Sequence, residues 1–256
     1  MKIAVICNTM NEFYSARMGL GVTLRNAGED FDLFVWDNGS KDERIKELVR
    51  GFNPKFYHES EENVGNPIAY NQMLLRVKEQ GYDYVAMIAP DMVLPNRWLS
   101  LYKEVYERCD LEGLLGYNWG MHQKKKMEIV KGVPLEFCDY VFGCWFFSTK
   151  FLDIVGFINE KYKVYGKWDS DWNFRGGAMG IKSYYLPVRC NHLIKAVGED
   201  KEYRRMKDKH LAMNEETFKS IVMSVLRRLK QLLHHISWFR YLRDISLLLI
   251  TSCIIG

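Results

Sequence analysis

The first hundred residues alternate between short apolar runs and longer segments with helical spacing. Four apolar runs predict buried strands, at 2–7, 31–36, 55–58 and 84–89. The segments between them predict helices, at 12–27, 41–50 and 66–80. This order requires crossover connections between neighbouring strands, so it predicts an α/β fold with a mostly parallel, Rossmann-like sheet flanked by helices.

The second half of the chain is less regular. Helices are expected at 96–108, 149–155 and 169–179, and strands at 142–147 and 183–188. Segment 113–121 is compatible with a strand or a loop, and the lysine run 124–126 is expected to be a solvated turn. We therefore expect one α/β domain over 1–200 and a helical extension over 201–256.

The net charge of +4 is unevenly distributed. Residues 201–244 hold eleven Lys/Arg and five Asp/Glu, so this segment carries +6 and the rest of the chain −2. From residue 215 apolar side chains recur at helical spacing, with basic residues mostly on the other faces. An apolar run of eleven residues follows at 245–255, which is shorter than the roughly 20 residues that span a bilayer.

This basic, amphipathic helix has two interpretations. In one, its apolar stripe packs on the first domain or on a second subunit, which gives a homodimer. In the other, it lies on an anionic membrane surface with residues 245–255 dipping in. We favour the membrane, because the final run has no polar face.

Composition excludes several classes of protein. With 48% hydrophobic and 27% charged residues, the chain is neither disordered nor a collagen-like repeat, and the small net charge gives no case for a nucleic-acid partner. The six cysteines form no C-x-x-C pair, which argues against a zinc ribbon and favours buried thiols in a reducing compartment. The apolar run 3–7 is too short for a signal-peptide core, so we expect a cytoplasmic protein at the cytosolic face of a membrane.

Polar residues follow four of the predicted strands. They are Asn8, Thr9 and Asn11; Asp37, Asn38 and Ser40; Asn63 and Gly65; and Asp91. Such residues are also common turn formers. Because the carboxyl ends of parallel strands meet at one sheet edge, where ligands bind, the four groups together predict a binding site.

Three of these groups suggest particular chemistry. A carboxylate at Asp37 can accept an N–H from a nucleobase. Asn63 and Gly65 form a turn that opens a helix carrying Ala69 and Asn71, where small residues allow a ligand to approach closely. Asp91 is placed to ligate a hard cation that holds a diphosphate.

The segment Trp168-Asp169-Ser170-Asp171-Trp172 opens a late helix, with Arg175 one turn further on. Acidic residues in a first turn can simply cap the helix and offset its dipole. A pair of aspartates between two tryptophans instead suggests a site for sugar rings. His192, just after a strand, is either a structural histidine or a second metal ligand.

These elements resemble a GT-A fold glycosyltransferase of family 2. Residues 36–42 (W-D-N-G-S-K-D) are similar to the family's V-D-N-x-S-x-D, and residues 63–71 match its N-x-G-x-x-x-A-x-N. Ala89-Pro90-Asp91 stands in place of the D-x-D motif. Residues 155–157 followed by 167–171 resemble the G-G-F and E-D-x-D stretch, and His192 stands where many members have a late histidine. The resemblance covers about residues 1–200.

The resemblance implies roles for named residues. The donor nucleotide would be bound by Thr9, Asn11, Asp37, Asn38, Asn63, Gly65 and Asn71. Mn²⁺ or Mg²⁺ on the donor diphosphate would be held by Asp91 and His192. The general base would be Asp169 or Asp171. The acceptor would be bound by Trp145, Trp168, Trp172 and Arg175.

The resemblance implies an inverting transfer of a hexosyl or deoxyhexosyl group from a UDP-, dTDP- or GDP-sugar to a hydroxyl acceptor. A glycan or a lipid-linked acceptor, as in polysaccharide biosynthesis, fits the expected membrane association. Two alternatives remain. One is an inactive relative that binds a sugar nucleotide at a membrane, since Ala89 and Trp168 replace acids of the family motifs. The other is a nucleotidyltransferase, against which the absence of a G-x-G-x-x-x-R-type loop after the first strand counts.

Overall fold

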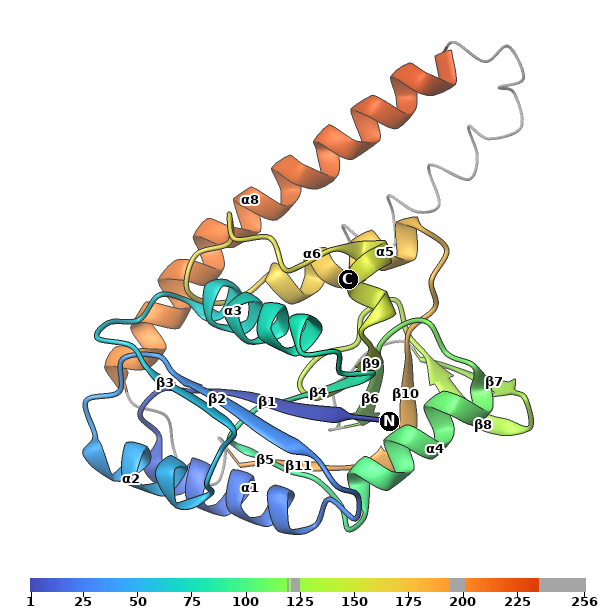
Figure 1. Ribbon diagram of the computed structural model, residues 1–256. Helices are drawn as coiled ribbons and strands as arrows, with labels where there is room; N and C mark the ends of the chain where they lie inside the picture. Colours follow the sequence, from blue (N-terminus) through green and yellow to red (C-terminus); the bar gives the residue numbers. More distant parts are fainter. Residues whose placement is uncertain (119, 121–124, 194–200, 235–256) are drawn as a thin grey trace. The chain divides into compact units, whose positions relative to one another are not determined.

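The computed structural model describes residues 1–118, 120, 125–193 and 201–234. They contain a nine-stranded sheet in the order β3-β2-β1-β4-β9-β6-β10-β8-β7 (Figure 1). Its strands are β1 (Ile3–Thr9), β2 (Asp32–Asp37), β3 (Phe56–Glu59), β4 (Tyr84–Ile88), β6 (Leu115–Asn118), β7 (Lys126–Val130), β8 (Val133–Phe137), β9 (Trp145–Ser148) and β10 (Tyr184–Arg189). A separate two-stranded sheet pairs β5 (Met92–Val93) with β11 (Asn191–His192).

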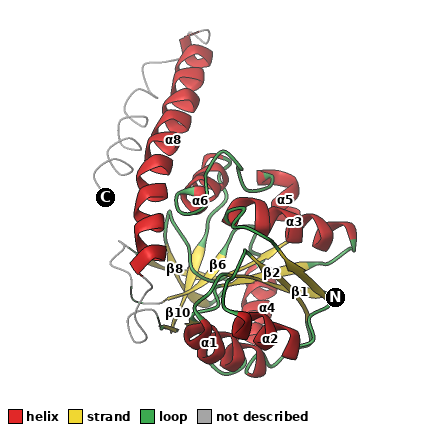
Figure 2. Cartoon of the chain, turned by 90° about the vertical axis from the view of Figure 1, so that its left-hand side faces the viewer, coloured by secondary structure: helices red, strands yellow, loops and turns green. Residues whose placement is uncertain are grey.

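Helices cover both faces of the large sheet. They are α1 (Phe13–Arg25), α2 (Glu43–Gly51), α3 (Asn66–Glu79), α4 (Trp98–Cys109), α5 (Lys150–Val155) and α6 (Trp168–Ala178), and a further long helix is α8 (Lys201–His234). Two views at right angles place α1, α2 and α4 on one face and α3, α5 and α6 on the other (Figures 1 and 2). The predicted α/β class, with helices flanking the sheet, is confirmed.

The strands from the first part of the chain form a parallel block. β1 pairs in parallel with β2 and β4, and β2 pairs in parallel with β3. All seven residues of β1 are buried, because helices cover both of its faces. This block places the ends of β1, β2 and β4 at one edge, as the strand–helix alternation predicted.

The other part of the sheet is mixed. β9 runs antiparallel to both β4 and β6, while β10 is parallel to β6 and antiparallel to β8. Strands β7 and β8 form an edge hairpin that includes Lys126, so the lysine run does not end in a turn as expected but leads into a strand. Met127 and Ile129 on β7 are exposed, and as residues two apart in a strand they lie on the same face of it, so this face of the edge strand meets solvent.

The chain divides into two compact units, Met1–Asn214 and Glu215–Gly256. Helix α8 crosses this division, so its first part belongs to the same unit as the sheet. The apolar run 245–255, for which we predicted membrane contact, lies outside the described residues. None of the helices in the described ranges is both long enough and apolar enough to cross a membrane.

Candidate active site

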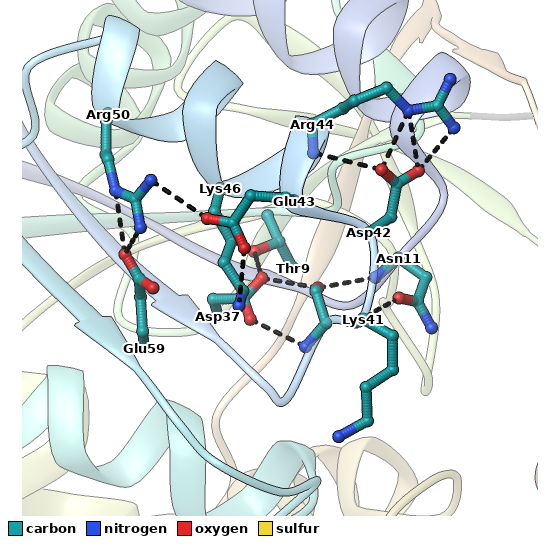
Figure 3. Close-up of polar contacts among 11 residues, drawn as sticks. Thr9, Asn11, Asp37, Lys41, Asp42, Glu43, Arg44, Lys46, Arg50 and Glu59 are labelled. Carbon is teal, nitrogen blue, oxygen red and sulfur yellow. Dashed lines mark hydrogen bonds and ion pairs between the residues drawn. The ribbon is translucent and has the colours of Figure 1, made fainter.

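The ends of β1 and β2 meet through the Asp37 carboxylate. Thr9 and Asp37 are partners in the strand register, and the Thr9 hydroxyl donates to Asp37 Oδ2 over 3.1 Å (Figure 3). Ser40 donates its hydroxyl to the same oxygen over 2.6 Å and its N–H to Oδ1 over 2.8 Å. Asp37 has no exposed surface. Its carboxylate therefore organises the 37–40 loop in this structure.

The loops after β1 and β2 are also joined through Asn11. Its N–H donates to Ser40 Oγ over 2.8 Å, and its side-chain oxygen accepts the N–H of Lys41 over 2.8 Å. In Figure 3 the Lys41 side chain points away from these contacts. Thr9, Asn11 and Asp37, predicted as donor-binding residues, thus lie together at the sheet edge.

Asn38 and Asn63 connect the same edge to the start of α3. Asn38 donates its amide to Asn63 Oδ1 over 2.8 Å, and Val64 N–H donates to Asn38 Oδ1 over 2.9 Å. Gly65, the residue before α3, donates its N–H to Asn63 Oδ1 over 2.9 Å. The two asparagines therefore shape the turn that precedes the helix.

Asn71 lies apart from this network. Its amide nitrogen donates to Ile158 O and to Glu160 Oε1, each over 2.8 Å, and its oxygen accepts the Ile158 N–H over 3.0 Å. Asn71 therefore fastens the loop after α5 to α3, and in this arrangement its amide is engaged by the protein.

Asp91 and His192 lie side by side, although 101 residues separate them. The antiparallel pairing of β5 with β11 places them there, and Leu193 N–H donates to Asp91 O over 2.9 Å. Asp91 Oδ2 and His192 Nε2 are 2.9 Å apart, and both side chains are partly exposed. A Cβ on Gly19 would clash with Pro90 O, so this glycine lets α1 approach the loop that carries Asp91.

One carboxylate and one imidazole fit a Mn²⁺ or Mg²⁺ ion that is completed by substrate phosphates and water. No cluster of three or more His, Cys, Asp or Glu suited to a metal occurs among the described residues. Ala89 removes the carboxylate that the resemblance would place two residues before Asp91. Any ion held here would therefore depend on Asp91, His192 and the donor itself.

The two aspartates of α6 occupy different environments. Asp169 is partly exposed, and its Oδ1 accepts the Ser170 N–H over 2.8 Å. Burial raises the pKa of Asp169 above the ordinary aspartate value, and hydrogen bonds from Tyr140 and Ser170 oppose that rise. Tyr140, a residue that the sequence did not single out, itself has a pKa raised mainly by burial.

Asp171 is fully buried and paired with Arg175, whose Nε lies 2.9 Å from Asp171 Oδ2. Burial raises the pKa of Asp171, against the opposing charge of Arg175. Arg175 also donates to the carbonyl oxygens of Val155 and, over 2.8 Å, Phe157. This pair ties α6 to the end of α5, and it leaves Asp169 as the more accessible carboxylate.

The aromatic residues predicted to bind an acceptor form a packed cluster. Trp145, Trp168 and Trp172 are 3%, 7% and 0% exposed, and the Trp145 ring centroid lies 5.2 Å from that of Trp168 and 5.8 Å from that of Trp172. The indole nitrogens of Trp145 and Trp172 donate to Val141 O and Gly156 O. In this conformation these rings pack α6 against β9 and present little surface to a ligand.

A cavity of about 580 Å³ opens elsewhere, at the amino end of β2. Its lining includes Leu24, Phe31 and Phe52, and none of the predicted site residues contributes to it. We base the candidate site on the convergence of polar groups at the carboxyl edge and not on this cavity, because open α/β sheets bind ligands at that edge.

The described residues have the fold of GT-A type glycosyltransferases. The mannosyltransferase PcManGT from Pyrobaculum calidifontis, solved with GDP-Man and Mn²⁺, aligns with a TM-score of 0.57 at 15% identity, over 77% of this chain and 58% of its own. GalNAc-T7 with UDP, GalNAc and Mn²⁺ aligns with a TM-score of 0.58 at 10% identity, over 75% and 44%. S. aureus TarS 1–349 with UDP-GlcNAc aligns with a TM-score of 0.53 at 14% identity, over 75% of this chain and 58% of its own.

The chain thus spans between 44% and 58% of the length of these three structures. No protein-family model and no curated protein sequence matches it. At these identities the comparisons establish the GT-A type fold, as the sequence motifs predicted. The narrower resemblance to family 2 stays a prediction.

Proposed function

We propose that this chain is a glycosyltransferase that moves a sugar from a nucleoside-diphosphate sugar to a hydroxyl acceptor. The observation that carries the proposal is the pairing of Asp91 with His192 over 2.9 Å, across 101 residues of a chain with a GT-A type fold. The structural neighbours PcManGT and GalNAc-T7, whose structures contain Mn²⁺ with GDP-Man or with UDP and GalNAc, support it.

In the proposed reaction, Asp169 accepts the proton of the acceptor hydroxyl as that oxygen attacks the anomeric carbon. The new carbon–oxygen bond forms as the bond to the diphosphate breaks, so the configuration inverts and a nucleoside diphosphate leaves. We assign the base to Asp169 and not Asp171, because Asp171 is fully buried and paired with Arg175. Asp171 instead keeps α6 in place.

Asp91 and His192 would hold Mn²⁺ or Mg²⁺, which when bound supplies positive charge against the leaving diphosphate. The network of Thr9, Asp37 and Asn38 gives the donor pocket its shape. Since its side chains largely bond to one another, we propose that the nucleoside meets the rim of this network, with Asn11 and Gly65 at its border.

The donor would be a hexosyl or deoxyhexosyl derivative of UDP, dTDP or GDP, and the acceptor a glycan or a lipid-linked sugar. We place the protein at the cytosolic face of a membrane. The five cysteines in the described ranges are buried thiols, which suits a reducing compartment. On α8 after Asn214, Met223 is 46% exposed while Lys219 and Arg227 are also exposed, which suits an anionic surface.

The activity is tested with the full chain, Mn²⁺ and a panel of UDP-, dTDP- and GDP-sugars. A true donor should raise the melting temperature in a metal-dependent way and should be consumed. Asp169→Asn should lower turnover by about 10²–10⁴-fold while donor binding persists. Asp110→Asn is the matched control, since that carboxylate is 84% exposed and its left-handed backbone (φ 55°) suits asparagine.

A second candidate is a binding module without turnover, which Ala89 favours because the strand end then carries one carboxylate fewer. That function predicts metal-dependent binding of a sugar nucleotide with no consumption in any acceptor mixture.

Co-sedimentation with anionic and with neutral phosphatidylcholine vesicles tests the membrane proposal. Binding to neither, together with a dimer in solution, would favour a subunit contact for α8.

A further inference from the structure

The loop that leads from α5 to α6 is held at three points by other elements. At its start, the Asn71 side chain bonds to Ile158 N and O. In its middle, Asn66 N–H donates to Val164 O over 3.0 Å. At its end it meets Asn214 of α8, which lies within the same compact unit.

Asn214 binds the main chain of this loop with its whole amide. Its Oδ1 accepts the Lys163 N–H over 2.9 Å, and its Nδ2 donates to the carbonyl oxygens of Lys163, Tyr165 and Gly166 over 2.6, 2.8 and 3.2 Å. The side chain is buried, with 1% exposure. An amide provides both the donor and the acceptor that these four contacts require.

The backbone that Asn214 holds is in an unfavourable conformation. Val164 has φ +51° and Lys167 has φ +63°, so two residues other than glycine are left-handed within four positions. For a β-branched residue this region is especially disfavoured. Such a conformation persists only where the surroundings enforce it. The contacts of Asn214 lie on both sides of Val164, at Lys163 before it and at Tyr165 and Gly166 after it, where they enforce this conformation.

On the other side of the loop, Gly65 leaves the space that the backbone needs. A Cβ on Gly65 would lie 2.9 Å from Val164 N. The loop is therefore enclosed between the turn that precedes α3 and the first part of α8. Lys167 is followed directly by Trp168 and Asp169, the first residues of α6.

We propose that Asn214 is a positioning residue for the reaction, because it holds the 163–167 loop in the conformation that places Asp169. The inference rests on the proposed function in that Asp169 is the base. The geometry of the loop stands independently of it. Loss of the Asn214 amide should release the loop and displace Asp169, while the hydrogen-bond network of Thr9, Asp37 and Asn38 at the donor site stays intact.

The test uses two full-length variants. Asn214→Asp keeps the shape and the acceptor but presents oxygen to three carbonyl groups, and Asn214→Ala removes all four bonds. Lys209→Ala, an exposed position on the same helix, is the matched control. Hydrogen–deuterium exchange is followed by mass spectrometry, and steady-state kinetics are measured with Mn²⁺ and the donor found in the panel of UDP-, dTDP- and GDP-sugars.

In both variants, peptides covering 159–169 should exchange roughly ten-fold faster or more, while β1 and β4 keep their protection. The kcat should fall by roughly 100-fold with little change in KM for the donor, as expected when a reacting group is displaced by about 1 Å. Lys209→Ala should match the wild type in both measurements.

Unchanged exchange at 159–169, equally faster exchange across the whole sheet, or a loss confined to KM would overturn the proposal. Should Asn214→Asp fail to fold, Asn214→Ala carries both measurements. Should the wild type turn over no donor, the proposed function fails, and the exchange experiment still decides whether Asn214 holds the loop.

Discussion

Two regions of the candidate site differ in how their carboxylates are accommodated: in one they are hydrogen-bonded by neighbouring groups, and in the other they are perturbed by burial. Around the ends of β1 and β2, Asp37 satisfies its carboxylate with Thr9 and Ser40, and the neighbouring amides bond to each other. At the start of α6, burial raises the pKa of both Asp169 and Asp171. Satisfied networks give rigidity, whereas perturbed carboxylates are characteristic of groups that exchange protons. We propose that the first region shapes the donor pocket and that Asp169, in the second region, supplies the chemistry.

The largest expected effect comes from removing the proposed base. Asp169→Asn should lower kcat by about 10²–10⁴-fold, the usual contribution of general base catalysis, with donor affinity retained. Because burial raises the pKa of Asp169, the wild-type rate should fall off on the acidic side at a pH above the ordinary aspartate value of about 3.9. A pH–rate profile with donor saturating measures both effects.

The same substitution has a consequence for stability. The folded state binds a proton at Asp169 more tightly than the unfolded chain, so the carboxylate becomes destabilising as pH rises through the raised pKa. Asp169→Asn should therefore melt higher than the wild type at neutral pH and equally near pH 3. If Asp169→Asn loses activity but melts at a lower temperature than the wild type at neutral pH, the proposal that Asp169 is a base with a raised pKa is contradicted.

The second effect concerns the buried ion pair of α6. Arg175→Ala leaves the Asp171 carboxylate buried without its partner, and should lower the free energy of unfolding by about 3–5 kcal/mol in urea titrations. The control is Arg50→Ala, where a 48% exposed guanidinium pairs with Glu59 and about 0–1 kcal/mol is expected. Equal losses of unfolding free energy in the two variants would contradict the distinction between a buried and an exposed ion pair.

Gly65 lies at the boundary between the two regions, where the turn before α3 meets the 163–167 loop. Gly65→Ala puts a Cβ about 2.9 Å from Val164 N at φ +92°, so it should cost about 1–3 kcal/mol and loosen the 163–167 loop. Gly81→Ala, at φ +68° with open space around it, carries the backbone strain alone. The difference between their unfolding free energies measures the close approach together with the additional backbone strain at Gly65, whose ψ of 151° lies in a region that favours glycine. Equal unfolding free energies would mean that the 163–167 loop moves aside for the new Cβ at no cost.

The smallest effect lies in the satisfied network. Thr9→Val removes one buried hydrogen bond to Asp37 and should cost about 1 kcal/mol, with kcat unchanged. A double-mutant cycle with Asp37→Asn isolates the coupling between the two side chains. A kcat loss as large as that of Asp169→Asn would show that the network takes part in the chemistry.

Much of the fold was predictable because its signals are local. The apolar run 2–7 followed by a polar loop describes β1, and Gly65 with Pro67 marks the start of α3. The hairpin of β7 and β8 was missed, because an exposed edge strand such as Lys126–Val130 lacks the apolar run by which a buried strand is recognised.

The candidate site divides in the same way. Motifs placed Thr9, Asp37 and Asp91 after strands, and the parallel register then brings the first two into contact. The burial of Trp172 and the role of Arg175 were not predictable, because spacing along a helix shows which residues share a face and not what covers it. Asn214 gave no signal, since its partners are main-chain atoms about fifty residues earlier in the chain.

The sequence alone determined the alternation of strands and helices, and with it the sheet edge at which polar residues collect, because periodicity and turn chemistry act between neighbours in the chain. The tertiary structure decided which of those residues meet. Pairing of β5 with β11 joined Asp91 to His192, and packing of α6 buried Asp171 while leaving Asp169 accessible. Solvation depends on which segments pack around a side chain, so the difference between the two aspartates exists only in the folded protein.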